Sequence, residues 1–251
     1  AHVILSARGG LKGEQIAGYV QKYPGRITGA VTSKGRHFKK NTDKYYKNLK
    51  KQMSRPEFGA MAEAILYHGQ KGSKANEVIV PLDSPQVDHL LQKSMEKNWP
   101  FILHIEFRKY KSRADRIMRQ LDKMLRAHPA HPFVLIHMGQ LDADRVRELI
   151  RLYPNLYFMT SHCEQKTGSN KAGWTMMLTG SKLKPPWKQL LVDHPDRFIL
   201  AFDANWPDEW RQEYKHLVQT WRKALTALPT SAAHQVAHEN AERLWRIPLS
   251  K

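Results

Sequence analysis

The chain has 251 residues, enough for one well-buried core. A hydrophobic content of 41% with seven Trp excludes an intrinsically disordered chain. No apolar run approaches the roughly 20 residues of a membrane span, so we expect a soluble protein, cytoplasmic or periplasmic. The single cysteine, Cys163, excludes a disulfide framework and a cysteine-based zinc cluster, so a metal site would have to use histidine and carboxylate ligands.

The formal charge of +18 is compatible with nucleic acid, an anionic membrane or an anionic substrate as a partner. We favour a generally basic surface, because net charge governs solubility and steering rather than fold. A small anionic substrate is therefore the expected partner. Nucleic acid is less favoured, no membrane partner is expected, and a homodimer is left open.

The first third of the chain predicts a strand at 2–6, a helix at 13–22 and a strand at 26–31. Residues 34–55 then carry nine Lys or Arg and one acid, with no clear period. One interpretation of this stretch is contact with nucleic acid or another anion. We prefer a solvated excursion beside the active-site mouth, or a lid.

The remaining elements alternate between strand and helix, which predicts a parallel sheet with helical cover in a single domain over 1–251. The expected strands are 61–66, 101–107, 133–139, 155–160 and 198–204. The expected helices are 84–98, 112–127, 142–152, 187–192, 208–225 and 231–244. Seven strands are expected in total, one fewer than in a closed eight-stranded barrel.

Four of these apolar strands carry a metal-type side chain near the carboxyl end, namely Glu63, His104, His137 and Asp203. Burial of such a group without a partner is costly, and chemistry is placed at the carboxyl ends of parallel strands. Because side chains alternate along a strand, Ile102, His104 and Glu106 should share one face, directed into the barrel. We therefore expect the four side chains to converge at one end.

Imidazole and carboxylate ligands suit a divalent ion such as zinc, with manganese as an alternative, and would activate water for attack on a carbonyl. Asp203 could accept the proton of that water, ligate the ion, or do both. A single buried histidine is more often structural than catalytic. Four such residues at matching strand ends favour a functional site.

Five segments in order along the chain carry a family resemblance: 99–106 (WPFILHIE), 134–139 (VLIHMG), 153–158 (YPNLYF), 196–203 (DRFILAFD) and 238–244 (HENAERL). Together they resemble the amidohydrolase superfamily, in its amidohydrolase-related branch of metal-dependent hydrolases and carboxylate decarboxylases. The resemblance implies a distorted TIM barrel. It also implies that His104 is a metal ligand, that His137 ligates metal or assists catalysis, that Asp203 is a ligand and general base, and that Glu63 ligates metal in some relatives.

One feature of that family is missing from this sequence, the His-x-His pair of its first strand. Together with the count of seven strands, this predicts that strand one lies upstream of Ala1. The alternative is that the chain has lost its metal site.

Several further residues follow the strand ends and are candidates for substrate binding: Glu106, Arg108, His162, His68 and Lys71. A guanidinium such as that of Arg108 can hold a substrate carboxylate by two hydrogen bonds. Our first functional hypothesis is a metal-dependent hydrolase acting on an ester, lactone or amide. A non-oxidative decarboxylase on the same scaffold is the second, and a non-catalytic barrel that binds polyanions is the third.

Overall fold

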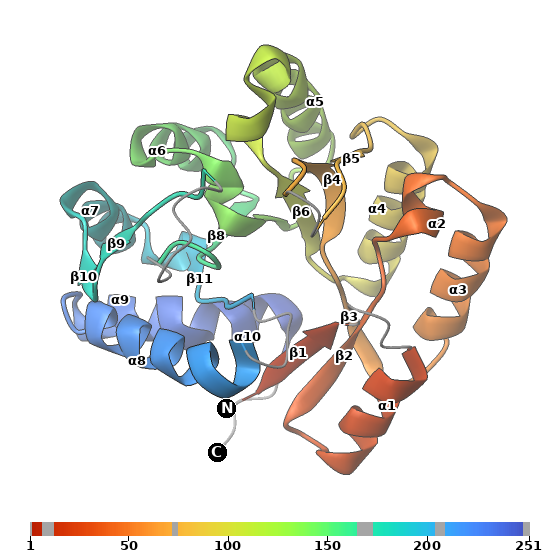
Figure 1. Cartoon of the computed structure of the whole chain (residues 1–251), viewed down its shortest axis with the longest axis horizontal. Coiled ribbons are helices and arrows are strands. Elements are labelled where there is room, and N and C mark those ends of the chain that lie inside the picture. The colour runs from red at the N-terminus through yellow and green to blue at the C-terminus, as the bar shows by residue number, and fades with distance from the viewer. Residues whose placement is uncertain (1, 7–12, 72–74, 165–172, 204–208, 248–251) are drawn as a thin grey trace.

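The strands of the protein form most of a barrel wall surrounded by helices (Figure 1). The structure, a computed structural model, describes residues 2–6, 13–71, 75–164, 173–203 and 209–247. One sheet is parallel and has the order β1-β2-β3. The second has the order β11-β8-β7-β6-β4-β5 and is parallel except for β5 at its edge. The wall strands are β1 (Val3–Ser6), β2 (Ile27–Val31), β3 (Phe58–Met61), β4 (Ala64–His68), β6 (Phe101–Ile105), β7 (Phe133–Leu135), β8 (Leu156–Met159) and β11 (Phe198–Ile199).

The two sheets are joined through the strand expected at 61–66, which is divided in the structure. β3 pairs with β2 and β4 pairs with β6, and the chain passes from one sheet to the other through Ala62 and Glu63. Of the remaining strands, β5 (Val78–Ile79) is antiparallel to β4, and β9 (Leu178–Thr179) and β10 (Lys182–Leu183) form a separate hairpin. The wall thus has the seven expected positions, with Glu63 at the break.

Small and branched side chains fill the interior of this wall. Ile102 of β6 lies in the interior cluster, whereas Leu103 and Ile105 lie in the outer core against the helices, which confirms the predicted alternation. The buried members of the interior cluster are Ala30, Ala60, Ala62, Ile102, Val134, Ile199, Leu244 and Trp245.

The described residues leave the barrel open between β11 and β1. Neither strand pairs with the other, and the gap lies where strand one of the resemblance would stand. Leu244 and Trp245, from the last helix, join Ile199 of β11 and Ile4 of β1 in the interior cluster. The helix α10 therefore contributes apolar side chains to the interior beside β11 and β1, the two strands that do not pair with each other.

The outer layer consists of helices whose apolar stripes face the wall. In α5, Ile117, Leu121 and Leu125 recur at four-residue spacing and are buried. The helices are α1 (Gly13–Lys22), α2 (Arg36–Lys39), α3 (Asp43–Met53), α4 (Pro85–Lys97), α5 (Ala114–Ala127), α6 (Ala143–Leu152), α7 (Pro185–Asp193), α8 (Tyr214–Leu225), α9 (Thr230–His234) and α10 (Asn240–Trp245). Among the described residues, no helix is long and apolar enough to cross a membrane.

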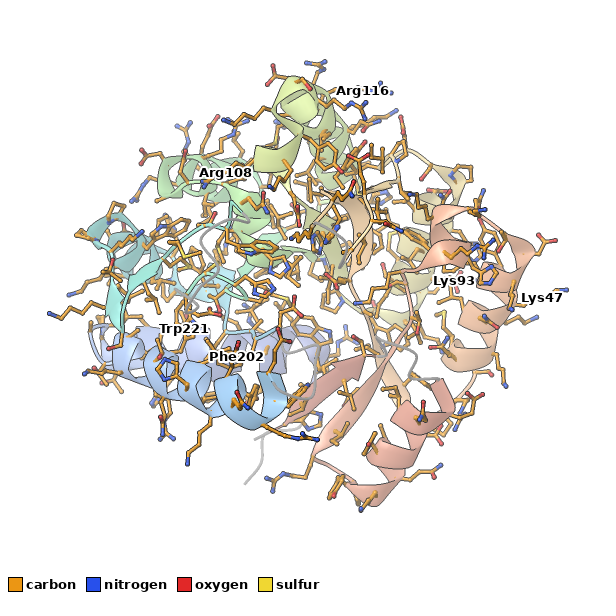
Figure 2. The ribbon with its side chains drawn as sticks, viewed as in Figure 1. Lys47, Lys93, Arg108, Arg116, Phe202 and Trp221 are labelled. Carbon is orange, nitrogen blue, oxygen red and sulfur yellow. The ribbon has the colours of Figure 1, made fainter. Side chains whose placement is uncertain are left out.

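The basic stretch at 34–55 is helical, which corrects the expectation of a solvated excursion or lid. It forms α2 and α3, and buries Phe38, Tyr45 and Leu49 in the outer core. Tyr45 and Leu49 are four residues apart, but the many lysines between and around them hide this period in the sequence. The side chain of Lys47 extends outward from α3 (Figure 2).

Two strands end four or five residues earlier than expected. β7 stops at Leu135, and the following turn holds His137, Met138, Gly139 and Gln140 in the left-handed region, with φ values of 57°, 53°, 61° and 60°. β11 stops at Ile199, so Asp203 lies beyond the strand. The side chains of His137 and Asp203 thus extend from irregular backbone, so strand alternation does not determine where they point.

The carboxyl-terminal helices also differ from expectation. A π-helical turn, Glu209–Glu213, precedes α8, while residue 208 lies outside the described residues. A second π-helical turn, η6 (Gln235–Glu239), separates α9 from α10 in the helix expected at 231–244.

Candidate active site

The first part of the site is an ion pair between Glu63 and His104. Glu63 stands at the break between β3 and β4, and its Oε2 accepts a hydrogen bond from Nδ1 of His104 at 2.7 Å. Its other oxygen, Oε1, accepts from the ammonium of Lys34 at 2.6 Å. Both partners of this Lys34–Glu63 pair are largely buried, with side-chain exposures of 11% and 13%. Burial opposes the ionised form of Glu63, but Lys34 and His104 together hold its pKa well below the usual range.

Glu106 forms a second buried carboxylate on the other side of His104. Its Oε1 accepts from Nζ of Lys71 at 2.7 Å and from Nε2 of His104 at 3.2 Å, and its Oε2 accepts from the backbone N–H of Gly69 at 3.0 Å. Desolvation works against ionisation, but the hydrogen bonds and charges of His104 and Lys71 lower the pKa of Glu106 to about 2.

His104 is therefore enclosed by two carboxylates. Burial alone would favour its neutral form, but Glu63 and Glu106 outweigh that effect and raise its pKa to about 9. At neutral pH the ring is an imidazolium that donates from both nitrogens. The sequence placed His104 and Glu106 on one face, and their contact agrees with that placement.

His137 has a different environment, because one of its nitrogens is unsatisfied. Nδ1 lies 2.9 Å from both the backbone carbonyl and the hydroxyl of Ser161, and a carbonyl can only accept, so Nδ1 carries the proton. Nε2 is buried and has no hydrogen-bond partner among the described residues. Burial, reinforced by the charges of His162 and His104, holds the pKa of His137 well below its usual range. Nε2 thus presents a lone pair.

The carboxylate of Asp203 lies near this nitrogen of His137. Its Oδ2 lies 2.9 Å from Nε2 of His162 and 3.8 Å from Nε2 of His137. Burial opposes ionisation of Asp203, but the hydrogen bond and charge of His162 prevail and lower its pKa. The carboxylate is accordingly ionised at neutral pH.

Trp174 packs on one side of these histidines, and no sequence motif marked it. Its ring lies 4.6 Å from that of His162 and 4.9 Å from that of His137, while Nζ of Lys71 lies 3.6 Å from its centroid. Trp174 therefore connects the Lys71–Glu106 pair with the His162–Asp203 pair.

Two groups of side chains have the composition and proximity of metal ligands. One is Glu63, His104 and His137, and the other is His137, His162 and Asp203, with one donor atom of each residue within 4.8 Å of the others. The four strand-end residues named from the sequence thus all reach this region, and His137 is common to both groups. Asp203 groups with His162, which the sequence placed in the pocket, and not with His104.

The remaining predicted substrate-binding residues divide into two kinds. His68 is buried in the network, with its Nε2 3.8 Å from Oε1 of Glu106, and burial lowers its pKa to about 4. A third histidine-carboxylate group, His68, His104 and Glu106, is formed in this way. Arg108, in contrast, is exposed (Figure 2). It lines a cavity of about 440 Å³ together with Asp142, Trp174 and Lys184.

A family model described as amidohydrolase matches residues 15–247. The chain belongs to the amidohydrolase family. This confirms the family that the five segments resemble, and it makes the protein an amidohydrolase-type, metal-dependent enzyme that acts as a hydrolase or a carboxy-lyase. No curated protein is significantly similar in sequence.

Solved structures share the fold of this amidohydrolase at low sequence identity. One is an uncharacterized TIM-barrel protein from Bordetella bronchiseptica, with a TM-score of 0.62 and 15% identity over 98% of this chain and 77% of that one. A probable 2-pyrone-4,6-dicarboxylic acid hydrolase from Acinetobacter baumannii with bound citric acid has a TM-score of 0.57 and 15% identity over 98% and 83%. A dihydroxybenzoic acid decarboxylase from Polaromonas, with bound manganese and the inhibitor 2-nitroresorcinol, has a TM-score of 0.55 and 15% identity over 95% and 74%. The likeness confirms the TIM-barrel fold class, here with an open wall.

Proposed function

We propose that this amidohydrolase-family chain is a hydrolase that uses one divalent metal ion to cleave an ester, lactone or amide bond in a small anionic substrate. The observation that carries the proposal is the buried Nε2 of His137, which has no hydrogen bond among the described residues and is fixed as a lone pair by the carbonyl of Ser161. A buried nitrogen without a hydrogen bond is costly, and a metal ion satisfies it.

The donors around His137 fit such an ion. The ring nitrogens of His137 and His162 and the carboxylate of Asp203 would provide two nitrogen ligands and one oxygen ligand, a set that zinc and manganese both accept. Glu63 and His104, the other ligands proposed from the sequence, adjoin His137. They are satisfied by Lys34 and Glu106, and would have to exchange these partners in order to ligate. When bound, the ion would supply Lewis acidity, which lowers the pKa of water and polarises a carbonyl group.

The protein groups around the ion position have distinct roles in this proposal. Asp203 is ionised, so it can accept a proton from an attacking water. Nε2 of His162 lies 2.9 Å from Oδ2 of Asp203, and His162 would exchange this contact for the ion if it ligates through that nitrogen. Lys71 and Lys34 place two ammonium groups beside the same network. Their charge favours a substrate that carries a carboxylate, since opposite charges attract strongly where water is excluded.

Decarboxylation is the second candidate function. The ammonium groups of Lys71 and Lys34, close to the proposed metal ligands, would also suit a substrate whose carboxylate is the reacting group. The dicarboxylic acid hydrolase and the dihydroxybenzoic acid decarboxylase of similar fold each act on a carboxylated molecule by name. Cleavage of a carbon–carbon bond needs no attacking water. The carbon that loses CO₂ takes up a proton instead, and the ionised Asp203 could deliver it only after receiving a proton from the substrate or from solvent.

The two reactions can be distinguished by assaying metal-depleted protein, restored with Zn²⁺ or Mn²⁺, on a panel of carboxylated lactones, esters and aromatic acids. Hydrolysis releases acid without CO₂, and decarboxylation releases CO₂. We expect His137→Ala and Asp203→Asn to lose at least a hundredfold in turnover with circular dichroism unchanged, while the exposed His216→Ala and Asp88→Asn retain it. Full turnover in the first pair would overturn the proposal. Salt-sensitive binding of polyanions without turnover would support the non-catalytic alternative.

A further inference from the structure

A second group of histidines lies outside the active site, on the joint between α9 and α10. His234 ends α9, His238 and Glu239 lie in the π-helical turn η6, and α10 follows directly. One donor atom from each of these three residues lies within 4.8 Å of the others, and the two imidazole rings are 5.8 Å apart. All three residues are exposed to solvent.

The joint packs along β11, where the carbonyl of Val236 in η6 accepts from the backbone N–H of Leu200 at 2.9 Å, and none of its three residues belongs to the histidine-carboxylate groups of the active site. The buried amide of Asn240, which follows η6, donates to the carbonyls of Pro195 at 2.7 Å and Phe198 at 2.9 Å. These carbonyls mark the amino end of β11, whereas Asp203 follows its carboxyl end. A ligand at the joint is therefore separate from the catalytic network.

The spacing of the residues suits a metal ion. Histidines four residues apart lie on the same side of a helix, one turn from each other. Two imidazoles and a carboxylate are the donors preferred by zinc, nickel and copper, and three protein ligands leave positions open for water. Hydrogen bonds to the backbone of β11 hold this segment in place, so the ligands are arranged before an ion arrives.

An outer carboxylate strengthens the case. Oε2 of Glu242 lies 3.2 Å from Nδ1 of His238, and this buried oxygen accepts no hydrogen bond among the described residues, so it is available to an Nδ1–H of His238. A carboxylate next to one ring nitrogen keeps the proton there and directs the lone pair of the other nitrogen outward, as is usual for metal-bound histidine. Glu242 would thus act as a positioning residue for His238.

The charge around the joint is unlike that of the rest of the protein. A cavity of about 630 Å³ beside it is lined by Asp196, Glu239 and Glu242 as well as His238, in a chain whose formal charge is +18. Arg243 also lines this cavity, but its guanidinium donates to the carbonyl of Asp196 and to Oδ1 of Asn240. Arg197 pairs with Asp196 at 3.3 Å, so Glu239 and Glu242 are the carboxylates of this cavity that attract a cation.

We propose that His234, His238 and Glu239, with Glu242 behind them, form a second binding site for a divalent transition-metal ion, independent of the catalytic site. The affinity of an imidazole-rich site of this kind should increase from Mn²⁺ to Ni²⁺ to Cu²⁺, and its affinity for Zn²⁺ should be lower than that for Cu²⁺. A bound ion bridges the end of α9 and the π-helical turn, and stabilises the folded chain because an unfolded chain does not hold the ligands together.

The test is calorimetric titration of metal-depleted protein with Ni²⁺ and Zn²⁺. In a His137→Ala/Asp203→Asn background, which removes the catalytic ligands, we expect one ion still to bind. Adding His238→Ala should weaken this binding at least tenfold, and Glu242→Gln by about tenfold or more. The exposed His216→Ala serves as the matched control and should leave binding unchanged.

A second experiment does not depend on that background. In the otherwise unchanged protein, His234→Ala/His238→Ala should remove one equivalent of bound Ni²⁺ and abolish the rise in melting temperature that this equivalent causes. Absence of Ni²⁺ binding in the catalytic-site background would overturn the proposal, as would binding that survives the loss of both histidines. Neither result bears on whether His137 and Asp203 hold the catalytic ion.

Discussion

The imidazole of His104 lies between two carboxylates, with Nδ1 2.7 Å from Oε2 of Glu63 and Nε2 3.2 Å from Oε1 of Glu106. Lys34 pairs with the first carboxylate and Lys71 with the second. The five charges alternate in sign from Lys34 to Lys71, so each buried group has a partner of opposite charge. Removal of one lysine or one carboxylate takes a charged partner away from a buried group, which is costly.

The first prediction concerns the protonation of His104. Replacing Glu63 with glutamine removes the carboxylate that contributes most to raising the pKa of this histidine to about 9. We expect the pKa to fall by one unit or more in metal-free protein, measured by NMR titration of the imidazole nitrogens. Glu57→Gln, at an ion pair with Arg55 elsewhere in the chain, is the control and should leave it unchanged. An unaltered pKa in Glu63→Gln would show that the carboxylate does not act on His104.

A second prediction is that Lys34→Met destabilises the metal-free protein by about 2 kcal/mol, because the buried Glu63 loses one of its two charged partners and keeps only His104. The double variant Lys34→Met/Glu63→Met should recover most of that loss, since the carboxylate is removed together with its lysine and His104 keeps Glu106 as its partner. Urea unfolding measures both. Lys51→Met breaks an exposed pair with Glu14 and should change the free energy of unfolding by less than about 0.5 kcal/mol. Equal effects of Lys34→Met and Lys51→Met would contradict the account.

The third prediction uses His131, which lies outside the active site. Its Nε2 is 3.0 Å from Oγ of Ser94, and burial, with a smaller contribution from His128, lowers its pKa to about 4. His131 therefore binds a proton below about pH 6.5 in the unfolded chain, but only below about pH 4 in the folded protein. The free energy of unfolding should fall as the pH is lowered from about 6.5 to 4, and this residue should add no further change below that.

Urea unfolding at several pH values tests this effect through the variant His131→Gln, which cannot titrate. The difference in free energy of unfolding between the natural protein and His131→Gln should shift in favour of the variant as the pH falls. The same substitution at the exposed His216 should show no such trend. A pH-independent difference for His131→Gln would contradict the prediction.

The fourth prediction concerns the left-handed turn that carries His137. Gly139 has φ of 61°, and a Cβ there would lie 2.7 Å from Cδ2 of Leu135. Gly139→Ala should destabilise the protein by about 2–4 kcal/mol, combining about 1–2 kcal/mol for the conformation with a similar cost for the clash. Gly25→Ala, also at positive φ but with open space around it, isolates the conformational part. Similar losses for both variants would show that the clash is absent.

The wall of the barrel, and the approach of the candidate site residues to one region, were predictable from the sequence. Continuous apolar runs such as 101–105 and 133–135 mark strands buried on both faces, and strand alternation placed Ile102 and His104 correctly. These properties depend on neighbours in the chain.

Contacts between distant segments could not be predicted in the same way. Lys34 was interpreted as one charge in a solvated stretch, because its pairing with Glu63 arises only when the ends of β2 and β3 meet. Trp174 lies in a segment without periodicity, and its packing on His162 is purely tertiary. The left-handed turn at His137 has a single glycine among four residues at positive φ, which is too weak a signal to mark it.

The central claim is that His137 and Asp203 hold a divalent ion. Its most direct test is elemental analysis of purified protein after incubation with Zn²⁺ or Mn²⁺ and gel filtration. Both samples carry His234→Ala/His238→Ala, which removes the second metal site proposed at the joint between α9 and α10. One sample is otherwise unchanged, and the other also carries His137→Ala/Asp203→Asn. We predict close to one ion per chain in the first sample and almost none in the second. Equal metal content in the two samples, or no metal in either, would contradict the account.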